Sequence, residues 1–347
     1  MTTVKLGQID HPSAWRASDF SSADDYAFDL TDRHLDAFAK AIAEVHADGV
    51  GLQELTSKHF TMPEIADDLA SIRSEIMDGR GMIVMRGFPV DDYSLDEISM
   101  IYWGIGTHFG RGVSQSPMGD RLGYVTDVSK PGTQERGYRS AKELRLHTDS
   151  DDIVGLLCIR QSKSGGLSRL ASAVAIHNEI AATRPDLLEP LYNGFHYHWF
   201  GEQPPGEPAI TDYRVPVFSW GGDQMSMCYL RDFINMAADD SGEPLSDQEV
   251  EALNLFESTA MREDLMLEFR HEPHNAFFIN NYTTLHSRTE FEDWPELDRR
   301  RLLLRLWLKG EPSRAVHPIL RRYYGDDGMH IDGRTDTIYD PEKAMTR

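Results

Sequence analysis

Cysteine is scarce in this sequence, with only Cys158 and Cys228 among 347 residues. Two cysteines are too few for a disulfide framework in a chain of this length, and such scarcity is typical of a reducing compartment. Residues 1–15 also lack the basic segment and apolar run that make up a secretory signal peptide. We therefore expect a cytoplasmic protein.

Long apolar runs and an excess of positive charge are missing as well. No stretch approaches the about 20 apolar residues that a membrane-spanning helix needs, so no membrane association is expected. Lysine and arginine total 35 against 57 aspartate and glutamate residues, which gives a formal net charge of −22. Such a charge repels nucleic acid, so nucleic acid is not expected as a partner either.

The distribution of helical and strand patterns predicts a single domain over residues 1–347. No internal repeat or low-complexity linker divides the chain. Residues 1–81 are expected to be helical, because apolar residues recur at helical spacing over 34–47. An apolar strand bounded by glycine follows at 81–87, and after about residue 120 short strands separated by turns predominate.

Many short strands favour a double-sheet architecture over alternating strand–helix units. We therefore predict a mainly β fold with α-helices, built on a double-stranded β-helix (jelly-roll) core over 82–310. Two helical patterns predict an insertion in this core at about 173–262. The tail over 311–347 is expected to be irregular. Strands are expected at 122–125, 144–147, 153–159, 168–171, 195–200, 215–220, 265–269, 276–279 and 302–308.

A histidine and an aspartate two residues apart end one expected strand, in His147-Thr148-Asp149. Residues i and i+2 of a strand point to the same side, so the imidazole and the carboxylate converge. His286, which follows another apolar strand, is the best candidate for a third ligand. Two imidazoles and one carboxylate leave three octahedral positions open, which suits a non-haem Fe(II) centre that binds a co-substrate and O₂ together.

A His-x-Asp triplet alone is weak evidence in a chain with 14 histidines. Two other pairs compete for a metal: His196 with His198, and His271 with His274. Neither pair has a carboxylate and paired arginines at matching positions. We therefore interpret these four histidines as structural or pocket-lining residues.

Two arginines and a glycine turn strengthen the case for a co-substrate site. Arg301 and Arg305 lie four apart on the last expected strand, so both point to one face beside aliphatic neighbours. Burying two guanidinium groups is costly unless anions meet them, and a dicarboxylate provides such anions. Ser168 follows the turn at Gly165-Gly166, where its hydroxyl can donate to a carboxylate. Surface ion pairs and a solvent-facing hairpin are the plainer alternatives.

Together these residues resemble the taurine dioxygenase and clavaminate synthase-like family of Fe(II)- and 2-oxoglutarate-dependent oxygenases. The resemblance spans about residues 82–308, and its further landmarks are Arg86-Gly87-Phe88 and Asn281. It implies the jelly-roll core, Fe(II) and 2-oxoglutarate as cofactors, and O₂ and a small molecule as substrates. The oligomeric state stays open, with a homo-oligomer as one alternative.

The resemblance assigns the iron to His147, Asp149 and His286. Related halogenases replace the metal carboxylate by Gly or Ala to make room for chloride, and here Asp149 occupies that position. The resemblance thus implies a dioxygenase that hydroxylates an unactivated C–H bond of a small, anionic or amino-acid-like substrate and releases succinate and CO₂. Desaturation, epoxidation and ring closure are alternative outcomes of the same iron chemistry.

The resemblance also assigns the co-substrate residues. It gives the distal carboxylate of 2-oxoglutarate to Arg301, assisted by Ser168. It gives the C1 carboxylate, together with an anionic group of the substrate, to Arg305. The interval after His286 is a few residues longer than in the taurine enzyme, so Arg300 is an alternative to Arg301, although the register of the strand favours Arg301.

Substrate-facing residues are harder to predict. The loop at 110–116 follows a helix and precedes a strand, and we expect Gln115 to face the substrate from it, unless the loop is an ordinary polar one. Two alternatives to the assigned function stay open. The chain is either a non-catalytic jelly-roll protein that binds a small molecule, or an oxygenase that needs no 2-oxoglutarate.

Overall fold

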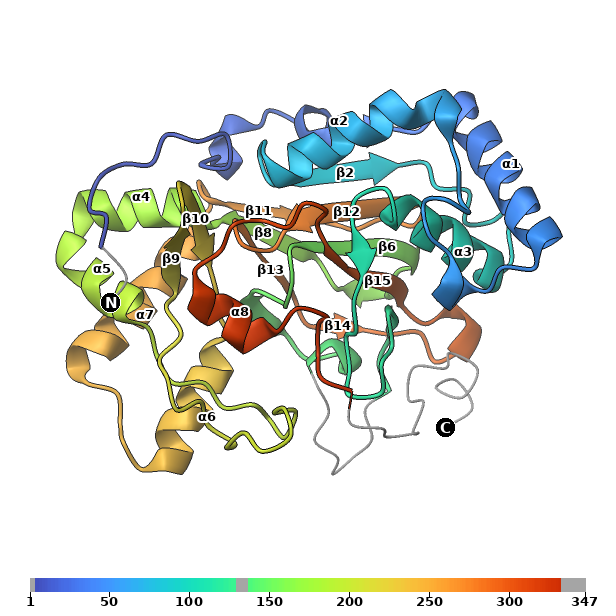
Figure 1. Ribbon diagram of the computed structural model, residues 1–347. Coiled ribbons are helices and arrows are strands. Elements are labelled where there is room, and N and C mark those ends of the chain that lie inside the picture. The colour runs from blue at the N-terminus through green and yellow to red at the C-terminus, as the bar shows by residue number, and fades with distance from the viewer. Residues whose placement is uncertain (1–3, 129–136, 332–347) are drawn as a thin grey trace.

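The computed structural model describes residues 4–128 and 137–331. Its fold is mixed α and β, with two large sheets and helices at both ends of the molecule (Figure 1). The larger sheet has the order β1-β2-β12-β6-β15-β3, with β4 also paired to β15. Its strands are β1 (Ala27–Asp29), β2 (Met82–Arg86), β3 (Arg111–Gly112), β4 (Leu122–Val125), β6 (Ile153–Arg160), β12 (Asn275–Asn280) and β15 (Leu302–Lys309).

The smaller of the two large sheets carries the histidines of the expected metal site. Its order is β11-β8-β13-β5, and all of its neighbouring strands are antiparallel. Two further antiparallel pairs, β9 with β10 and β7 with β14, stand apart from it. The strands are β5 (Leu144–His147), β8 (Ser168–Ser172), β11 (Met266–Phe269), β13 (Thr284–Arg288), β7 (Ser164–Gly165), β14 (Phe291–Glu292), β9 (Phe218–Gly221) and β10 (Gln224–Met227).

Successive side chains of each strand point to opposite faces of the larger sheet, and apolar side chains pack on both faces. In β12, Ala276 and Phe278 belong to the core beneath the N-terminal helices. Phe277 and Ile279 belong to a second cluster, which also contains Leu170 from β8 of the smaller sheet. The two sheets therefore pack face to face, and each fully buried Phe or Ile side chain contributes roughly 1.5–3 kcal/mol through loss of apolar surface.

Helices cover the outer faces of the two sheets. In Figure 1, α1–α3 lie against the larger sheet and α4–α7 gather at the other end of the molecule. Ser94 and Ser246 are the N-cap residues of α3 and α7, and each hydroxyl oxygen accepts a hydrogen bond from the backbone N–H of the Glu three residues later. The helices are α1 (Asp32–Asp48), α2 (Ala66–Met77), α3 (Leu95–Gly106), α4 (Ala173–Thr183), α5 (Leu188–Asn193), α6 (Arg231–Ser241), α7 (Asp247–Ala260) and α8 (Pro318–Tyr324).

Two expectations from the sequence are wrong in detail. Residues 195–200 form isolated bridges at Phe195 and His198 rather than a strand, because positive φ angles at Phe200 and Gly201 end the extended chain. The tail contains α8, where the sequence predicted irregular structure. The helix forms because Pro318 fits its first turn and its apolar side buries Leu320 against the cluster around α4–α7. Residues 332–347 lie outside the described residues.

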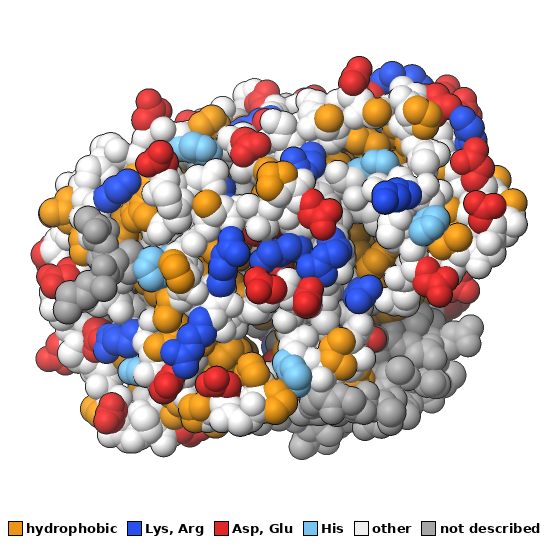
Figure 2. All heavy atoms as spheres, viewed as in Figure 1, with side chains coloured by type: hydrophobic (Ala, Val, Ile, Leu, Met, Phe, Trp, Pro, Cys, Tyr) orange, Lys and Arg blue, Asp and Glu red, His pale blue; other side chains and the backbone are white. Residues whose placement is uncertain are grey.

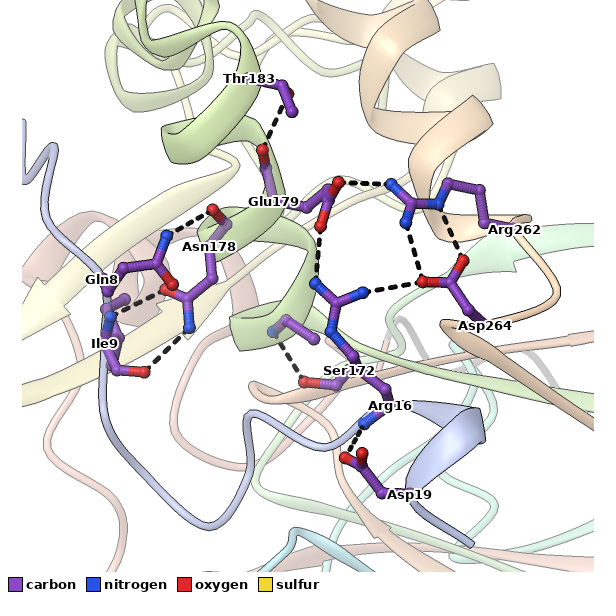
Figure 3. Close-up of polar contacts among 11 residues, drawn as sticks. Gln8, Ile9, Arg16, Asp19, Ser172, Asn178, Glu179, Thr183, Arg262 and Asp264 are labelled. Atoms are coloured by element: carbon purple, nitrogen blue, oxygen red, sulfur yellow. Dashed lines mark hydrogen bonds and ion pairs between the residues drawn. The ribbon is translucent and has the colours of Figure 1, made fainter.

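The N-terminal segment is fastened to the outside of α4 (Figure 3). Arg16 pairs with Glu179 at 2.6 Å and with Asp264 at 2.7 Å, and Arg262 pairs with the same two carboxylates. Partly exposed ion pairs contribute little singly, but a closed network of four charges holds its geometry better than one pair does. This network therefore holds the segment around Arg16, which precedes β1, against α4.

Acidic and basic side chains are interspersed on the face drawn in Figure 2. Within residues 4–128 and 137–331, no helix is both long and apolar enough to cross a membrane.

Candidate metal centre and co-substrate site

His147 and His286 face each other across two paired strands. They are register partners between β5 and β13, and their ring centroids lie 4.2 Å apart. The Asp149 carboxylate turns toward both rings, with Oδ1 3.7 Å from Nε2 of His147 and Oδ2 3.5 Å from Nε2 of His286. One ligand atom from each residue lies within 4.8 Å of the others, and the described residues contain no second such group of three.

The protonation of these side chains suits a divalent metal. Nδ1 of His147 lies 2.8 Å from the carbonyl oxygen of Arg145, which leaves Nε2 free as a ligand. Burial and the neighbouring His286 lower the pKa of His147 to about 4, so the ring is neutral at pH 7. Burial alone would raise the pKa of Asp149, but Arg305 and His286 more than offset it and hold this pKa well below its usual range. Two imidazoles and one carboxylate fit Fe(II).

Asn281 fixes the loop that carries Asp149. Its side-chain oxygen accepts a hydrogen bond of 2.8 Å from the backbone N–H of Asp149, and its amide group donates to the carbonyls of Asp149 and Asp151. Asp151 has a φ of 70°, a left-handed conformation that is costly for a residue with a side chain. The amide of Asn281 therefore holds a strained turn next to the metal position. The sequence marked Asn281 as a landmark without assigning it this role.

Trp307 holds the same carboxylate from the larger sheet. Its indole N–H donates a hydrogen bond of 2.9 Å to Oδ2 of Asp149. Along β15, Leu304 and Leu306 point into the core beneath the helices, whereas Arg305 and Trp307 point to the side of the smaller sheet. The sequence analysis did not assign a role to Trp307, although its position two residues after Arg305 predicted that the two side chains share one face of the strand.

Replacing Trp307 by Phe is expected to weaken Fe(II) binding about tenfold with little loss of thermal stability. The change keeps most of the ring but removes the hydrogen bond that orients the carboxylate, and such supporting bonds are typically worth about 10- to 100-fold in metal affinity. Anaerobic Fe(II) titration measures the effect. Trp199→Phe is the control, because Trp199 lines the same cavity without a hydrogen bond to Asp149. Equal affinities in the two variants would contradict this role.

The predicted co-substrate arginines are both buried between the sheets. Arg301 is 3% exposed and Arg305 is 4% exposed. Nη1 of Arg305 lies 3.6 Å from Oδ2 of Asp149, next to the metal position. Arg300, the alternative to Arg301, is only partly buried, and its guanidinium donates to the backbone carbonyl of Trp294. The geometry therefore favours Arg301.

Ser168 begins β8 immediately after the glycine turn. Gly165 and Gly166 have φ angles of 69° and 66°, which explains why two glycines occupy this turn. In the register of the sheet, Ser168 pairs with Arg288 and Leu170 pairs with His286. Ser168 therefore lies on the same side of the sheet as the histidine, as the prediction requires.

Gln115 lies behind Arg305 rather than free in a substrate loop. Its side-chain oxygen accepts a hydrogen bond of 2.7 Å from Nε of Arg305, and its amide group donates to the carbonyls of Arg121 and Arg305. The side chain is fully buried. Since both amide protons are engaged within the chain, the expectation that Gln115 faces the substrate is corrected to a positioning role for Arg305.

Arg288 is a buried cation that the sequence analysis did not assign. Burial and the nearby charge of Arg301 lower the pKa of Arg288 to about 9, and burial lowers the pKa of Arg301 to about 10. Both side chains are therefore still charged at pH 7. The sequence could have pointed to Arg288, because it lies two residues after His286 and therefore on the same side of a strand.

Two cavities open at the metal position. The larger, of about 510 Å³, is lined by the aromatic side chains of Trp199, Trp307 and Tyr323. The smaller, of about 350 Å³, contains His147 and Arg305. Asp149, Leu230 and Phe233 line both cavities. Volumes of this size hold small molecules.

The competing histidine pairs lie elsewhere. Nδ1 of His196 contacts the carbonyl of Thr211, and Nε2 of His271 contacts that of Asn275. None of the four histidines joins a group of three ligands in the part of the chain that the structure describes.

Residues 28–307 match the family described as Taurine catabolism dioxygenase TauD, TfdA family. The chain belongs to this family. As a TauD/TfdA member it is a non-haem iron dioxygenase with Fe(II) and 2-oxoglutarate as cofactors, and the predicted enzyme class is confirmed. Membership also confirms the resemblance drawn from the motifs.

Two curated TauD/TfdA-like relatives extend over most of the chain. The FR-33289 synthase of Streptomyces rubellomurinus is 29% identical over 308 residues, which cover 87% of this chain and 90% of that protein. The taurine hydroxylase-like protein SAT17 of Stachybotrys chartarum is 28% identical over 316 residues, with 87% and 80% covered. The similarity therefore extends well beyond the metal motifs.

Solved structures support the TauD/TfdA-type fold. The asparagine oxygenase complex with Fe(II), 3-hydroxyasparagine and succinate superposes with a TM-score of 0.65 at 18% identity, covering 88% of this chain and 99% of that one. The non-haem iron oxygenase OrfP with Fe and alpha-ketoglutaric acid gives a TM-score of 0.59 at 14% identity, covering 81% and 93%. At such identities the likeness concerns the fold alone.

Proposed function

We propose that this dioxygenase hydroxylates an unactivated C–H bond of a small, anionic or amino-acid-like molecule, with His147, Asp149 and His286 holding the iron. The observation that carries the proposal is the convergence of these three side chains beside the buried cation of Arg305. A protein that only binds a small molecule has no need for a set of two histidines and one carboxylate next to buried arginines.

The second part of the proposal concerns the two carboxylates of 2-oxoglutarate. Arg301 and Ser168 would hold the distal carboxylate, while Arg305 would lie near the C1 carboxylate and near an anionic group of the substrate. Buried, unpartnered nitrogen atoms on both arginines support this assignment: Nε and Nη1 of Arg301 and Nη2 of Arg305 have no hydrogen-bond partner within the described residues. An anion from outside the chain would satisfy them.

The roles of the surrounding residues follow from the geometry. When bound, Fe(II) and 2-oxoglutarate would supply the oxidation: 2-oxoglutarate would lose CO₂ and take up one oxygen atom of O₂ to become succinate, and the other oxygen atom would enter the substrate. Gln115 orients Arg305, and Trp307 orients the carboxylate of Asp149. The aromatic wall of the larger cavity limits water near the reacting carbon and holds the substrate in place.

We further propose that the chain is one domain over residues 1–347 with a jelly-roll core at 82–310. Residues 173–262 would be an insertion, because the strands on either side of it, β8 and β11, pair with each other in one sheet. The tail at 311–347 would follow the core, and 1–81 would precede it as the helical segment. Cys158 and Cys228 are buried and unpaired, which supports the expected cytoplasmic location.

Succinate release across a panel of small molecules tests the proposed reaction. With Fe(II), 2-oxoglutarate and O₂, we expect amino acids or other small carboxylates and sulfonates to raise succinate formation well above the rate without substrate. Betaines and aryloxyacetates complete the panel. The asparagine and hydroxyarginine named for the two similar structures make amino acids the first candidates. A product of the starting mass plus one oxygen atom is expected, and a product of any other mass would contradict hydroxylation.

A further inference from the structure

Arg288 lies next to Ser168, a residue of the proposed co-substrate site. It follows His286 by two residues in β13, so its side chain leaves the strand on the same side as the histidine. Its register partner on β8 is Ser168, and partners across antiparallel strands bring their side chains together. The Arg288 side chain is only 6% exposed. It therefore extends from the metal ligand's strand toward the predicted position of the distal carboxylate.

The guanidinium of Arg288 is poorly satisfied by the protein. One terminal nitrogen, Nη2, donates to the backbone carbonyl of Lys142, whereas Nε is buried and has no partner within the described residues. Nε and Nη1 of Arg301 are unpartnered as well. The acidic side chains that act on these cations through their charge are Asp127, for Arg288, and Asp293, for Arg301, but the three buried nitrogen atoms still have no hydrogen-bond partner in the described part of the chain. Oδ1 of Asp293 accepts hydrogen bonds from backbone N–H groups, and its buried Oδ2 has no hydrogen-bond partner within the described residues.

The two cations share one neighbour. The guanidinium carbons of Arg288 and Arg301 lie 4.5 and 5.3 Å from the centroid of the Phe291 ring. Two like charges buried this close repel each other, and an aromatic ring offsets only part of that cost. A bound anion would remove the repulsion and supply the missing acceptors.

We propose that Arg288 is a second arginine of the co-substrate site and binds the distal carboxylate of 2-oxoglutarate together with Arg301. A carboxylate offers about four lone pairs, enough for donors from two guanidinium groups and the hydroxyl of Ser168. The consequence is specificity, because a 2-oxo acid without the distal carboxylate leaves the buried N–H groups of both arginines without an acceptor. This inference rests on the proposed function and adds a selectivity residue to it.

The test compares 2-oxoglutarate with 2-oxopentanoate, which has the same chain length but a methyl group in place of the distal carboxylate. Each is titrated into the anaerobic Fe(II) protein, and the visible charge-transfer band gives the Kd. In Arg288→Ala the Kd for 2-oxoglutarate is expected to rise about 10- to 100-fold, as for the loss of a hydrogen bond between charged groups. The Kd for 2-oxopentanoate is expected to stay within about twofold, as for a change outside its contacts.

Two further variants separate binding from folding. Arg288→Lys retains the charge but not the planar guanidinium group that binds a carboxylate through two N–H groups. We expect a smaller loss of affinity, again confined to 2-oxoglutarate. Arg169→Ala is the matched control, because Arg169 follows Ser168 but points outward to Glu143 and Glu268. In metal-free protein, succinate is expected to raise the Tm of the wild type and of Arg169→Ala but not that of Arg288→Ala.

The outcomes distinguish this inference from the function on which it rests. An unchanged Kd for 2-oxoglutarate in Arg288→Ala, or an equal loss for both acids in both Arg288 variants, overturns the role of Arg288 alone. A folded wild-type protein that gives no band with either acid overturns the proposed co-substrate site, and the role of Arg288 with it. A selective loss in both Arg288 variants supports it.

Discussion

His286→Ala is expected to abolish iron-dependent succinate release, with a fall of more than about a thousandfold. The metal supplies several kcal/mol of the rate enhancement, and about 4 kcal/mol corresponds to a factor of a thousand. The substitution leaves only Nε2 of His147 and the carboxylate of Asp149 at the site, too few to retain Fe(II). The measurement is succinate formation per chain together with bound iron after desalting.

The fold is expected to survive this change. His286 lies in the middle of β13, whose backbone pairs with both β5 and β8, and these hydrogen bonds do not depend on the imidazole. His198→Ala is the control, because His198 pairs with Asp240 away from the three ligands. Retained iron and activity in His286→Ala would contradict the assignment, as would an equal loss in His198→Ala.

Arg301→Ala is expected to raise the Kd for 2-oxoglutarate by a factor of about a hundred to a few thousand. Removing one partner of a buried charge pair costs about 3–5 kcal/mol, which corresponds to this range. Iron affinity is expected to stay near the wild-type value, since Arg301 is not one of the residues that contact Asp149. The separation of the two affinities distinguishes loss of the co-substrate from damage to the metal site.

Arg300→Ala is the matched control for this prediction. Arg300 is the preceding residue in the chain, but its guanidinium donates to the carbonyl of Trp294. It is expected to bind 2-oxoglutarate with wild-type affinity. If Arg300→Ala weakens binding and Arg301→Ala does not, the alternative register is correct. If activity in Arg301→Ala stays intact, the enzyme does not need 2-oxoglutarate.

Much of the site was predictable because strand geometry is local. The two-residue period of a strand predicted that His147 and Asp149, and likewise Arg301 and Arg305, share a side, although Asp149 follows the end of β5 and Arg301 precedes β15. The core strands followed from the same period: β6, β12 and β15 lie where apolar runs predicted them. The order of the motifs along the chain then sufficed for the family.

The rest depends on contacts between segments far apart in the sequence. The hydrogen bond from Trp307 to Asp149 joins positions 158 residues apart, and that between Gln115 and Arg305 joins positions 190 apart. A role for Arg288 can be inferred only when Ser168 is known to be its partner on the neighbouring strand. The helix α8 was missed because its stability comes from burying Leu320 against distant helices, not from a long local pattern.

The most direct test of the iron and 2-oxoglutarate site is the visible absorption of the anaerobic protein on addition of 2-oxoglutarate. With one equivalent of Fe(II), the account predicts a weak charge-transfer band in the wild type that saturates at one co-substrate per chain. The band is expected to be absent from His147→Ala. Its absence from correctly folded, iron-loaded wild-type protein, or its persistence in His147→Ala, would contradict the assignment of His147, Asp149 and His286 to the metal.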